Sequence, residues 1–578
     1  MSSTILVVIG LAIYAILYFT YGKSLERKVV VADSARRTPA HKLSDGVDYV
    51  PSNKWVLFGH HFASIAGAAP IVGPAIAMAW GWLPAILWVW LGNIFIGAVH
   101  DYLALMSSVR HDGKSVQWIA GRLMTRRTGY AFSWYVECVL ILVIAAFAAV
   151  IAGIFAKNPP VPSASFFFLV SAVIFGYILY KAKVNFYLAT AIGIVMMAVA
   201  IWLGSMLPMT LSYKGWLAML FIYIIVASAL PVWVLLQPRD YLNAWLLWAG
   251  LAIGGVALLI AVKALATPGY TMWSAPVIAG RPSPFWPLIP LIIACGSLSG
   301  FHSLVSSGTS SKQLDNERSG LFVAYGGMLT EGFLSTIVVA SIASFGLVAL
   351  GEKAAALATP TDFGLGYGKA IGAVGGPVGI FSKSYALGVN AGLGLSVQVM
   401  TVFAGLWVSA FALTTLDTAN RLGRFAIEEI VDPLRDKAPG FHGVLANRWI
   451  ASLIPAFVGI YLAWGGGWAI IWPAFGGANQ LLASIALLTG AVWVSKVLKA
   501  SPGYRLSVLI PALFLWVTVT LALAWYLVVA VPTFIAKAPA QAWILGTITV
   551  IMLGLNLLLF YDFVQAMRRE EIVAYEAA

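Results

Sequence analysis

Charged residues are scarce in this sequence. Asp, Glu, Lys and Arg make up only 10% of its 578 residues, whereas 61% of the residues are hydrophobic. Soluble domains contain about 25% charged and about 45–50% apolar residues. Because a water-soluble fold of this length could not bury so much apolar surface, the composition excludes a soluble protein and predicts a chain surrounded by lipid.

Cysteine and hydrolytic motifs are almost absent as well. The two cysteines, Cys138 and Cys295, lie within apolar runs and offer neither a disulfide framework nor a zinc-finger spacing. The sequence contains no His-Glu-x-x-His, and no Gly-x-Gly-Asp or Gly-x-Ser-Gly at membrane depth, so an intramembrane enzyme is not expected. Neither a cofactor nor a bound metal is predicted.

Apolar segments of spanning length dominate what is present. A membrane-spanning helix needs about 20 mostly apolar residues, and about 15 segments qualify. With the N-terminus outside the cytoplasm, 27 of the 35 Lys and Arg residues fall in cytoplasmic loops, as the positive-inside rule requires. The net charge of +13 is therefore a topology signal, and nucleic-acid binding is not expected. The predicted spans are 3–20 (a retained helix, not a signal peptide), 55–80, 82–108, 130–156, 163–181, 184–206, 215–237, 241–265, 284–310, 321–349, 391–415, 447–463, 466–492, 506–531 and 542–566.

The second predicted span carries Gly67, Pro70, Gly73 and Pro74 close together. Glycine and proline weaken the backbone hydrogen bonding of a helix, and a broken membrane helix is tolerated where it lines a cavity. Such breaks present amides to anionic substrates and carbonyls to cations. The alternative is a helix that is merely kinked and tightly packed. The predicted substrate contacts on this span are Ser64, Gly67, Ala68 and Ala69.

A matching break is predicted at 227–233, where Ser228 and Trp233 would face the first break. Five helices at 55–206 are then followed by five more at 215–415, and an odd number of spans inverts the second set. This predicts the five-plus-five inverted repeat of leucine-transporter-like carriers. The segment 1–54 adds one preceding helix and a cytoplasmic linker, and 447–578 adds four following helices.

The predicted span 284–310 is unusually rich in serine and glycine. Small and hydroxyl-bearing residues allow close helix packing, which is the simpler interpretation. Sodium-coupled carriers of this architecture instead place hydroxyls at a cation site, and Ser303, Ser306 and Ser307 are positioned for that role. Because no carboxylate is evident beside them, coupling to H⁺ and coupling to Na⁺ both stay open.

Ionisable residues within spans are costly to insert, and each one suggests function. His60 and His61 lie at nearly the same predicted depth as Asp101 on the next helix. A histidine–carboxylate pair exchanges a proton near neutral pH, although a structural ion pair is the alternative. Asn93, Gly97, Asp101 and Ala104 share one helix face, which predicts a partner there. The predicted coupling or gating residues are His60, His61, His100, Asp101 and Glu137, whereas Glu331 is expected to be structural.

Several motifs resemble the carbon starvation protein family. They are 58–67 with Gly92 and 100–102, 294–303 with 312–314, 415–417 with 421 and 423–425, and 473–483. The resemblance implies a bacterial inner-membrane importer induced when carbon is short, carrying pyruvate or small peptides, with protons. It also implies a fold similar to the amino acid–polyamine–organocation superfamily.

The predicted function is therefore secondary active transport, with a small molecule and membrane lipid as partners. A proton symporter of a small carboxylate or of peptides is expected, with the N-terminus extracytoplasmic and the C-terminus cytoplasmic. A sodium-coupled symporter is the alternative, and a channel is less expected because two inverted broken helices are typical of a carrier. The glycine-rich stretch 350–390 is expected to be an extracytoplasmic loop.

Overall fold

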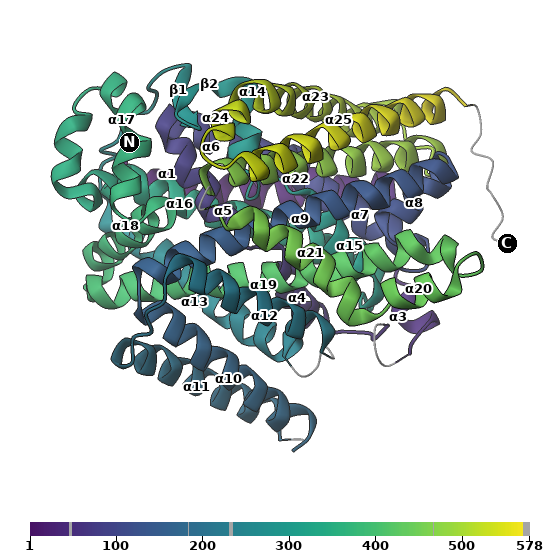
Figure 1. Cartoon of the computed structure of the whole chain (residues 1–578), viewed down its shortest axis with the longest axis horizontal. Helices are drawn as coiled ribbons and strands as arrows, with labels where there is room; N and C mark the ends of the chain where they lie inside the picture. The colour runs from purple at the N-terminus through teal and green to yellow at the C-terminus, as the bar shows by residue number, and fades with distance from the viewer. Residues whose placement is uncertain (46–48, 183, 231–234, 466–467, 570–578) are drawn as a thin grey trace.

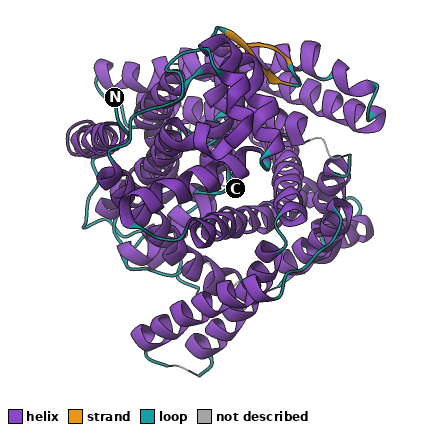
Figure 2. Cartoon of the chain, turned by 90° about the vertical axis from the view of Figure 1, so that its left-hand side faces the viewer, coloured by secondary structure: helices purple, strands orange, loops and turns teal. Residues whose placement is uncertain are grey.

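The computed structural model describes residues 1–45, 49–182, 184–230, 235–465 and 468–569. These residues form a helical bundle with one two-stranded antiparallel sheet, β1 (Ser274–Ile278) and β2 (Arg281–Pro284), at its upper edge (Figures 1 and 2). Within the described part, eleven helices are long and apolar enough to cross a membrane, or up to thirteen if each of two bent pairs is one span. The prediction of a polytopic helical protein is confirmed.

The predicted count of fifteen spans included two segments that are shorter than expected. One is α12 (Tyr213–Ala229), which has 17 residues. The other is the segment 284–310, which is divided into α14 (Phe285–Ile292) and α15 (Gly300–Gly308). At 1.5 Å rise per residue, neither half of this divided segment reaches across about 30 Å of hydrocarbon.

The first predicted break is present. Helix α4 (Lys54–Ile65) is bent by 48° from α5 (Ala69–Ala77), which continues into η3 (Met78–Trp80). The non-helical residues are 66–68, so the break precedes the prolines. Pro70 lies in the first turn of α5, where a missing amide hydrogen costs nothing, and Pro74 lies inside the helix.

A further break lies in a segment that was predicted as one span. The segment 293–299, between α14 and α15, is non-helical, so the expectation of one continuous helix over 284–310 is wrong. Gly296 has φ of +82°, and a Cβ on it would lie only 2.0 Å from Oγ of Ser335, so this position requires glycine. Helix α12 is continuous as far as Ala229, and residues 231–234, including Trp233 of the predicted break, lie outside the described residues.

Three long helices run through the centre of the bundle: α9 (Arg126–Lys157), α19 (Val397–Val431) and α22 (Trp468–Val492). Helix α9 packs against both α19 and α22. Helices α10 (Pro160–Tyr180) and α11 (Phe186–Met206) form a hairpin that projects from the lower side of the bundle in Figure 1, beside α13 (Leu236–Ala261).

Two predicted loops are helical. The stretch 350–390 contains η8 (Gly351–Leu357), α17 (Pro360–Ala373) and α18 (Gly376–Leu393), and Thr359 and Asp362 form a capping box at the start of α17. Its glycines are packing positions: a Cβ on Gly392 would lie 2.2 Å from the Ala257 carbonyl oxygen, so α18 and α13 approach closely. Likewise α19 continues through 416–431, which was predicted as a cytoplasmic loop.

The other elements follow the predicted spans. The N-terminal run Ser3–Val30 extends the predicted first helix, and the predicted span 82–108 is one continuous run from Trp82 to Arg110. The remaining bounds are α1 (Ser3–Leu17), η1 (Tyr18–Gly22), α2 (Lys23–Leu25), η2 (Glu26–Val30), α3 (Pro39–Lys42), α6 (Trp82–Gly92), η4 (Asn93–Gly97), α7 (Ala98–Arg110), α8 (Val116–Leu123), η5 (Ser310–Lys312), η6 (Glu317–Ser319), η7 (Leu321–Tyr325), α16 (Gly326–Leu350), η9 (Asp432–Leu434), α20 (Pro439–Leu445), α21 (Arg448–Ala463), η10 (Trp493–Val497), α23 (Pro502–Trp525), η11 (Tyr526–Ala530), α24 (Pro532–Ile535) and α25 (Pro539–Arg568).

Candidate functional site: a cavity between two broken helices

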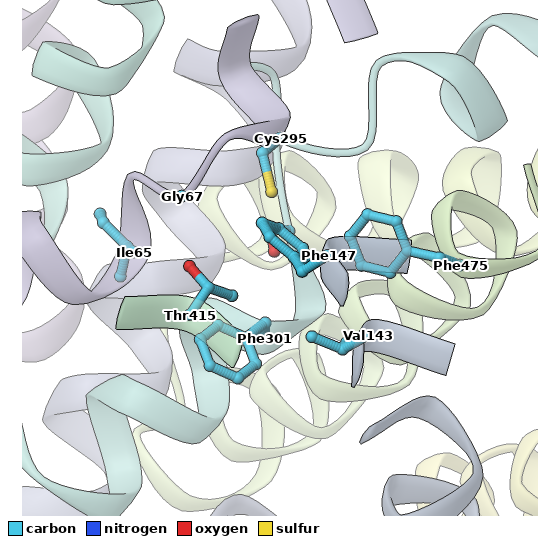
Figure 3. Close-up of a pocket in the computed structure, with 9 residues that line it drawn as sticks. Ile65, Gly67, Val143, Phe147, Cys295, Phe301, Thr415 and Phe475 are labelled. Atoms are coloured by element: carbon cyan, nitrogen blue, oxygen red, sulfur yellow. The ribbon is translucent and has the colours of Figure 1, made fainter. Parts of the chain in front are cut away.

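A small cavity lies where the two broken helices meet (Figure 3). Its volume is about 10 Å³, room for about one water molecule. Helix α4 packs against α15 and α5 packs against α14, so the two broken helices run antiparallel past each other. The lining residues come from both breaks and from α9, α19 and α22: Ile65, Gly67, Val143, Phe147, Cys295, Ser299, Phe301, Thr415 and Phe475.

The first break carries unpaired polar groups next to the cavity residue Gly67. The amides of Ala68 and Ala69, at the N-terminus of α5, make no hydrogen bond to a described residue. Oγ1 of Thr415 on α19 is buried and also lacks a partner within the described residues. A Cβ on Gly67 would lie 2.5 Å from this hydroxyl oxygen, so glycine keeps the break and α19 in close approach. Amides at a helix N-terminus together with a hydroxyl suit a carboxylate.

The second break is held by side chains of α22. Nδ2 of Asn479 donates to the Ala294 carbonyl at 2.8 Å, and Oδ1 of Asn479 accepts from the Phe301 amide at 2.9 Å. Nε2 of Gln480 donates to the Leu298 carbonyl at 2.8 Å, and Nε1 of Trp472 donates to the Ile292 carbonyl at 3.1 Å. Buried backbone groups in a membrane need such partners, which explains why the chain tolerates this break.

A buried network of ionisable groups lies beside the second break. Asp101 on α7 contacts two imidazoles: its Oδ1 lies 2.7 Å from Nδ1 of His100, and its Oδ2 lies 2.9 Å from Nδ1 of His302 on α15. On the other side of the His302 ring, Nε2 lies 3.6 Å from Oε2 of Glu331 on α16. Asp101, His302 and Glu331 are completely buried, so their charges interact through a medium of low polarisability.

The predicted partner face of the third span, 82–108, is confirmed. Nδ2 of Asn93 donates to the carbonyls of Gly296 and Met328 at 2.8 and 2.7 Å. A Cβ on Gly97 would lie 2.4 Å from the Ser297 carbonyl oxygen. With Asp101 bound to His302, this face packs on the second break rather than on the first.

The predicted pairing of Asp101 with His60 and His61 is therefore wrong. Nδ1 of His61 lies 2.8 Å from Oγ of Ser310, and Nε2 of His60 is buried without a partner within the described residues. Glu137 on α9 is also buried, and neither carboxyl oxygen has a described hydrogen-bond partner. These three residues do not join the Asp101 network through any described hydrogen bond or ion pair.

The predicted serine cluster is already partly engaged. Oγ of Ser303 donates to the Gly300 carbonyl at 2.6 Å, and Oγ of Ser307 donates to the Ser303 carbonyl at 2.7 Å. Oγ of Ser306 is buried without a partner within the described residues. Two of the three hydroxyls thus satisfy their own helix, which disfavours the predicted cation site.

Four predicted substrate contacts, Ser64, Ala68, Ala69 and Ser228, are not among the lining residues. Oγ of Ser64 donates to the His60 carbonyl at 2.8 Å, within its own helix. Oγ of Ser228 donates to the Ile225 carbonyl at 3.1 Å and accepts from Nδ2 of Asn420 at 3.1 Å. Gly67 does line the cavity, and Cys295, Ser299 and Phe301 of the second break and α15 line it as well, whereas residues 231–234 lie outside the described residues.

A second buried ion pair fixes α19 close to the cavity. Arg239 on α13 binds the Asp417 carboxylate, and the Tyr223 hydroxyl on α12 donates to Oδ2 of Asp417 at 2.7 Å. Nη2 of Arg239 also donates to Oδ1 of Asp240 at 2.8 Å. Asp417 follows Thr415 by two positions, so this pair ties three helices together near the first break.

Known proteins with similar sequences are transporters. The family model of carbon starvation protein CstA matches residues 2–523. The chain belongs to this family. A relative in Bacillus subtilis (strain 168), peptide transporter CstA, is 32% identical over 97% of this chain and 96% of its own length. The pyruvate/proton symporter BtsT of Escherichia coli (strain K12) is 30% identical over 90% of this chain and 81% of its own length.

The fold is also similar to that of a solved transporter. A crystal structure of the Eremococcus coleocola manganese transporter aligns with a TM-score of 0.50, at 12% identity, over 91% of this chain and 99% of that one. This chain is thus a multi-pass membrane protein of a transporter family with a transporter fold.

One group of side chains in the described residues has the donor set of a metal site. Ligand atoms of Cys295, His302 and Glu331 lie within 4.8 Å of one another. Structural zinc sites are closed by four protein ligands, and this group offers three. Nδ1 of His302 is bound to the Asp101 carboxylate, so Nε2 is the ring atom that faces Glu331 and could exchange a proton with it.

Sequence reasoning missed the pairing of His302 with Glu331, the cavity residue Thr415 and the buried Arg239–Asp417 pair. The run Gly296-Ser297-Leu298-Ser299-Gly300, preceded by Pro287 and Pro290, carried the same glycine and proline signal as the first break. It was interpreted as close helix packing because its serines suit that as well.

Proposed function

We propose that the chain is a secondary transporter that imports a small carboxylate, pyruvate for preference, together with protons across the inner membrane. The single observation that supports this most is the cavity bounded by both broken helices, with Gly67 of the first break and the unpaired Thr415 hydroxyl among its lining residues. None of the nine lining residues is charged, so a carboxylate would be bound by these dipoles and by the positive end of α5.

The narrowness of the cavity favours a small solute over a peptide. Its volume of about 10 Å³ is room for about one water molecule, so even a small carboxylate requires the two broken helices to part. The aromatic rings of Phe147, Phe301 and Phe475 make up much of its wall. A peptide, the substrate named for several relatives, would require these rings to move apart.

The proposed architecture is an inverted repeat opened by α4–α5 and by α14–α15. The antiparallel packing of these two broken helices supports an inverted relation. Alternating access would then open the cavity to one side and then to the other, with the N-terminus outside and the C-terminus in the cytoplasm. We propose no enzymatic activity and no cofactor.

Uptake of labelled pyruvate into proteoliposomes tests the function. An inward proton gradient should drive accumulation, whereas a sodium gradient alone should not. A proton uncoupler should collapse the accumulated pyruvate, and liposomes without protein provide the background. If neither pyruvate nor any dipeptide is taken up faster with the proton gradient, the proposal is wrong.

Charge movement separates the two substrate classes. One pyruvate anion with one proton carries no net charge, whereas one zwitterionic dipeptide with one proton carries one positive charge. A potassium diffusion potential, inside negative, should therefore leave pyruvate uptake unchanged and accelerate uptake of a dipeptide. Voltage-driven peptide uptake without pyruvate uptake would replace pyruvate by peptides as the substrate.

A further inference from the structure

Glu331 is a carboxyl group with too little positive charge around it. It is completely buried, and neither of its oxygens has a hydrogen-bond partner within the described residues. The nearest cationic group is the His302 ring, whose Nε2 lies 3.6 Å away. An ionised carboxylate in this position would be stabilised by the backbone amide of Gly296 and by a charged His302, which already faces the carboxylate of Asp101.

Asp101 has the opposite environment. Each of its oxygens is within hydrogen-bond distance of an imidazole Nδ1, at 2.7 Å for His100 and 2.9 Å for His302. An ionised carboxylate can only accept, so both rings donate from Nδ1 and their Nε2 atoms are left to take up or release a proton. Nε2 of His302 is the one that faces Glu331.

We propose that Glu331 is the carboxyl that carries the coupling proton, that His302 passes this proton on, and that Asp101 is a positioning residue that orients the ring. This inference rests on the proposed function. The proton leaves the Glu331 carboxyl and binds Nε2 of His302, and the resulting imidazolium pairs with Asp101 and Glu331 while it is charged. Nε2 then releases the proton to water on the side to which the cavity opens, and the Glu331 carboxylate takes up the next proton from the other side.

The proton pair and the cavity share one segment of chain. Cys295 lines the cavity, and its Sγ belongs to the group of ligand atoms within 4.8 Å that includes Nε2 of His302 and an oxygen of Glu331. Because His302 lies on α15 and Glu331 lies on α16, any shift of the second break changes their separation. Substrate that displaces the second break would thereby alter the affinity of the pair for a proton.

Other titratable groups face this pair from several helices. His100 on α7 contacts Asp101, and Cys295 lies beside His302. Tyr14 on α1 interacts with Glu331, and His61 on α4 interacts with His302 while its Nδ1 is bound to Ser310. None of these residues is a lysine or arginine, so none of them supplies a permanent positive charge that would compensate Glu331.

The test compares Glu331→Gln with Asp101→Asn in proteoliposomes. Two assays are used: accumulation of labelled pyruvate under a proton gradient, and exchange of labelled for unlabelled pyruvate at equal pH on both sides. One pH unit supports about tenfold accumulation with one coupled proton. Glu331→Gln should reduce this ratio to about one while exchange continues and no longer varies with pH. Glu352→Gln, at an exposed carboxyl, should behave as the parent protein does.

Two results would overturn the inference. One is a Glu331→Gln protein that still accumulates pyruvate, particularly if Asp101→Asn keeps exchange and loses accumulation, because Asp101 would then carry the proton. The other is a folded Glu331→Gln protein without exchange. If Glu331→Gln does not fold by size-exclusion chromatography, Glu331→Asp decides: it should keep accumulation with a shifted pH dependence, and an unshifted one overturns the inference. If the parent protein itself neither accumulates nor exchanges pyruvate, the proposed function fails instead.

Discussion

The two broken helices differ in what satisfies their exposed backbone. At the first break, 66–68, no described side chain from another helix hydrogen-bonds to the backbone, and the nearby Thr415 hydroxyl has no partner within the described residues. At the second break, 293–299, α22 supplies Asn479, Gln480 and Trp472 as partners. Unpaired buried polar groups are costly, so they are expected where a ligand completes them.

The difference suggests a division of labour. The first break offers binding groups to a substrate, whereas the second break is fixed by α22 and positions the Asp101–His302–Glu331 network. Ion and substrate would then meet different breaks of the same cavity, with Cys295 between them. Substitutions at each break test this difference between the two breaks.

The first prediction concerns how α19 is held against the first break. Arg239→Ala should lower the free energy of unfolding by about 3–5 kcal/mol, because it leaves the buried Asp417 carboxylate without its cation. Denaturation in detergent, followed by tryptophan fluorescence, measures the change. Arg435→Ala is the control, since its pair with Asp432 is exposed and contributes less than about 1 kcal/mol. Equal effects of the two substitutions would show that the Arg239 pair does not hold α19.

The second prediction concerns the clamp on the second break. Asn479→Ala should lower the free energy of unfolding by about 2–4 kcal/mol, since it leaves the Ala294 carbonyl and the Phe301 amide buried without partners. The same denaturation assay measures it. Asn390→Ala removes an amide that donates to the Leu395 carbonyl at an exposed site, and it should have little effect. A stability unchanged by Asn479→Ala would mean that the second break is as open as the first.

Much of the fold was predictable because hydropathy and the positive-inside rule act on long segments. The first break was predictable from Gly67 and Pro70, and the packing face of Asn93, Gly97 and Asp101 from its helical spacing. Helices α17 and α18 were not, because glycine is common both in loops and at close helix contacts. Composition alone does not separate these two uses.

The partner of Asp101 was not predictable from depth alone. Predicted depth in the membrane suggested His61 as a partner of Asp101. Packing instead brings His302 to Asp101, while His61 contacts Ser310. For the same reason Glu331 was expected to be structural: its helix was assigned to the periphery, yet its side chain faces His302. Contacts between segments distant in sequence carry no local signal.

The third prediction probes the open break. Gly67→Ala should reduce pyruvate uptake by about tenfold or more, because a Cβ there would lie 2.5 Å from Oγ1 of Thr415 and overpacking of this kind costs about 1–3 kcal/mol. Gly59→Ala, on α4 just before the break, is the matched control, since the nearest atom to its Cβ would be 3.9 Å away. Initial uptake rates, normalised to folded protein, measure both variants. Similar rates for the two variants would remove the first break from the binding site.

The smallest expected effect is on a chemical probe of the boundary between the breaks. In a Cys138→Ser background Cys295 is the remaining cysteine, and its thiol lines the cavity. Pyruvate at a concentration equal to its Kd should lower the rate of Cys295 modification by a small thiol reagent about twofold, because half of the sites are occupied. In the reciprocal Cys295→Ser protein, modification of Cys138 should be unaffected by pyruvate. Protection of Cys138 but not of Cys295 would place the substrate outside the cavity that the two breaks share.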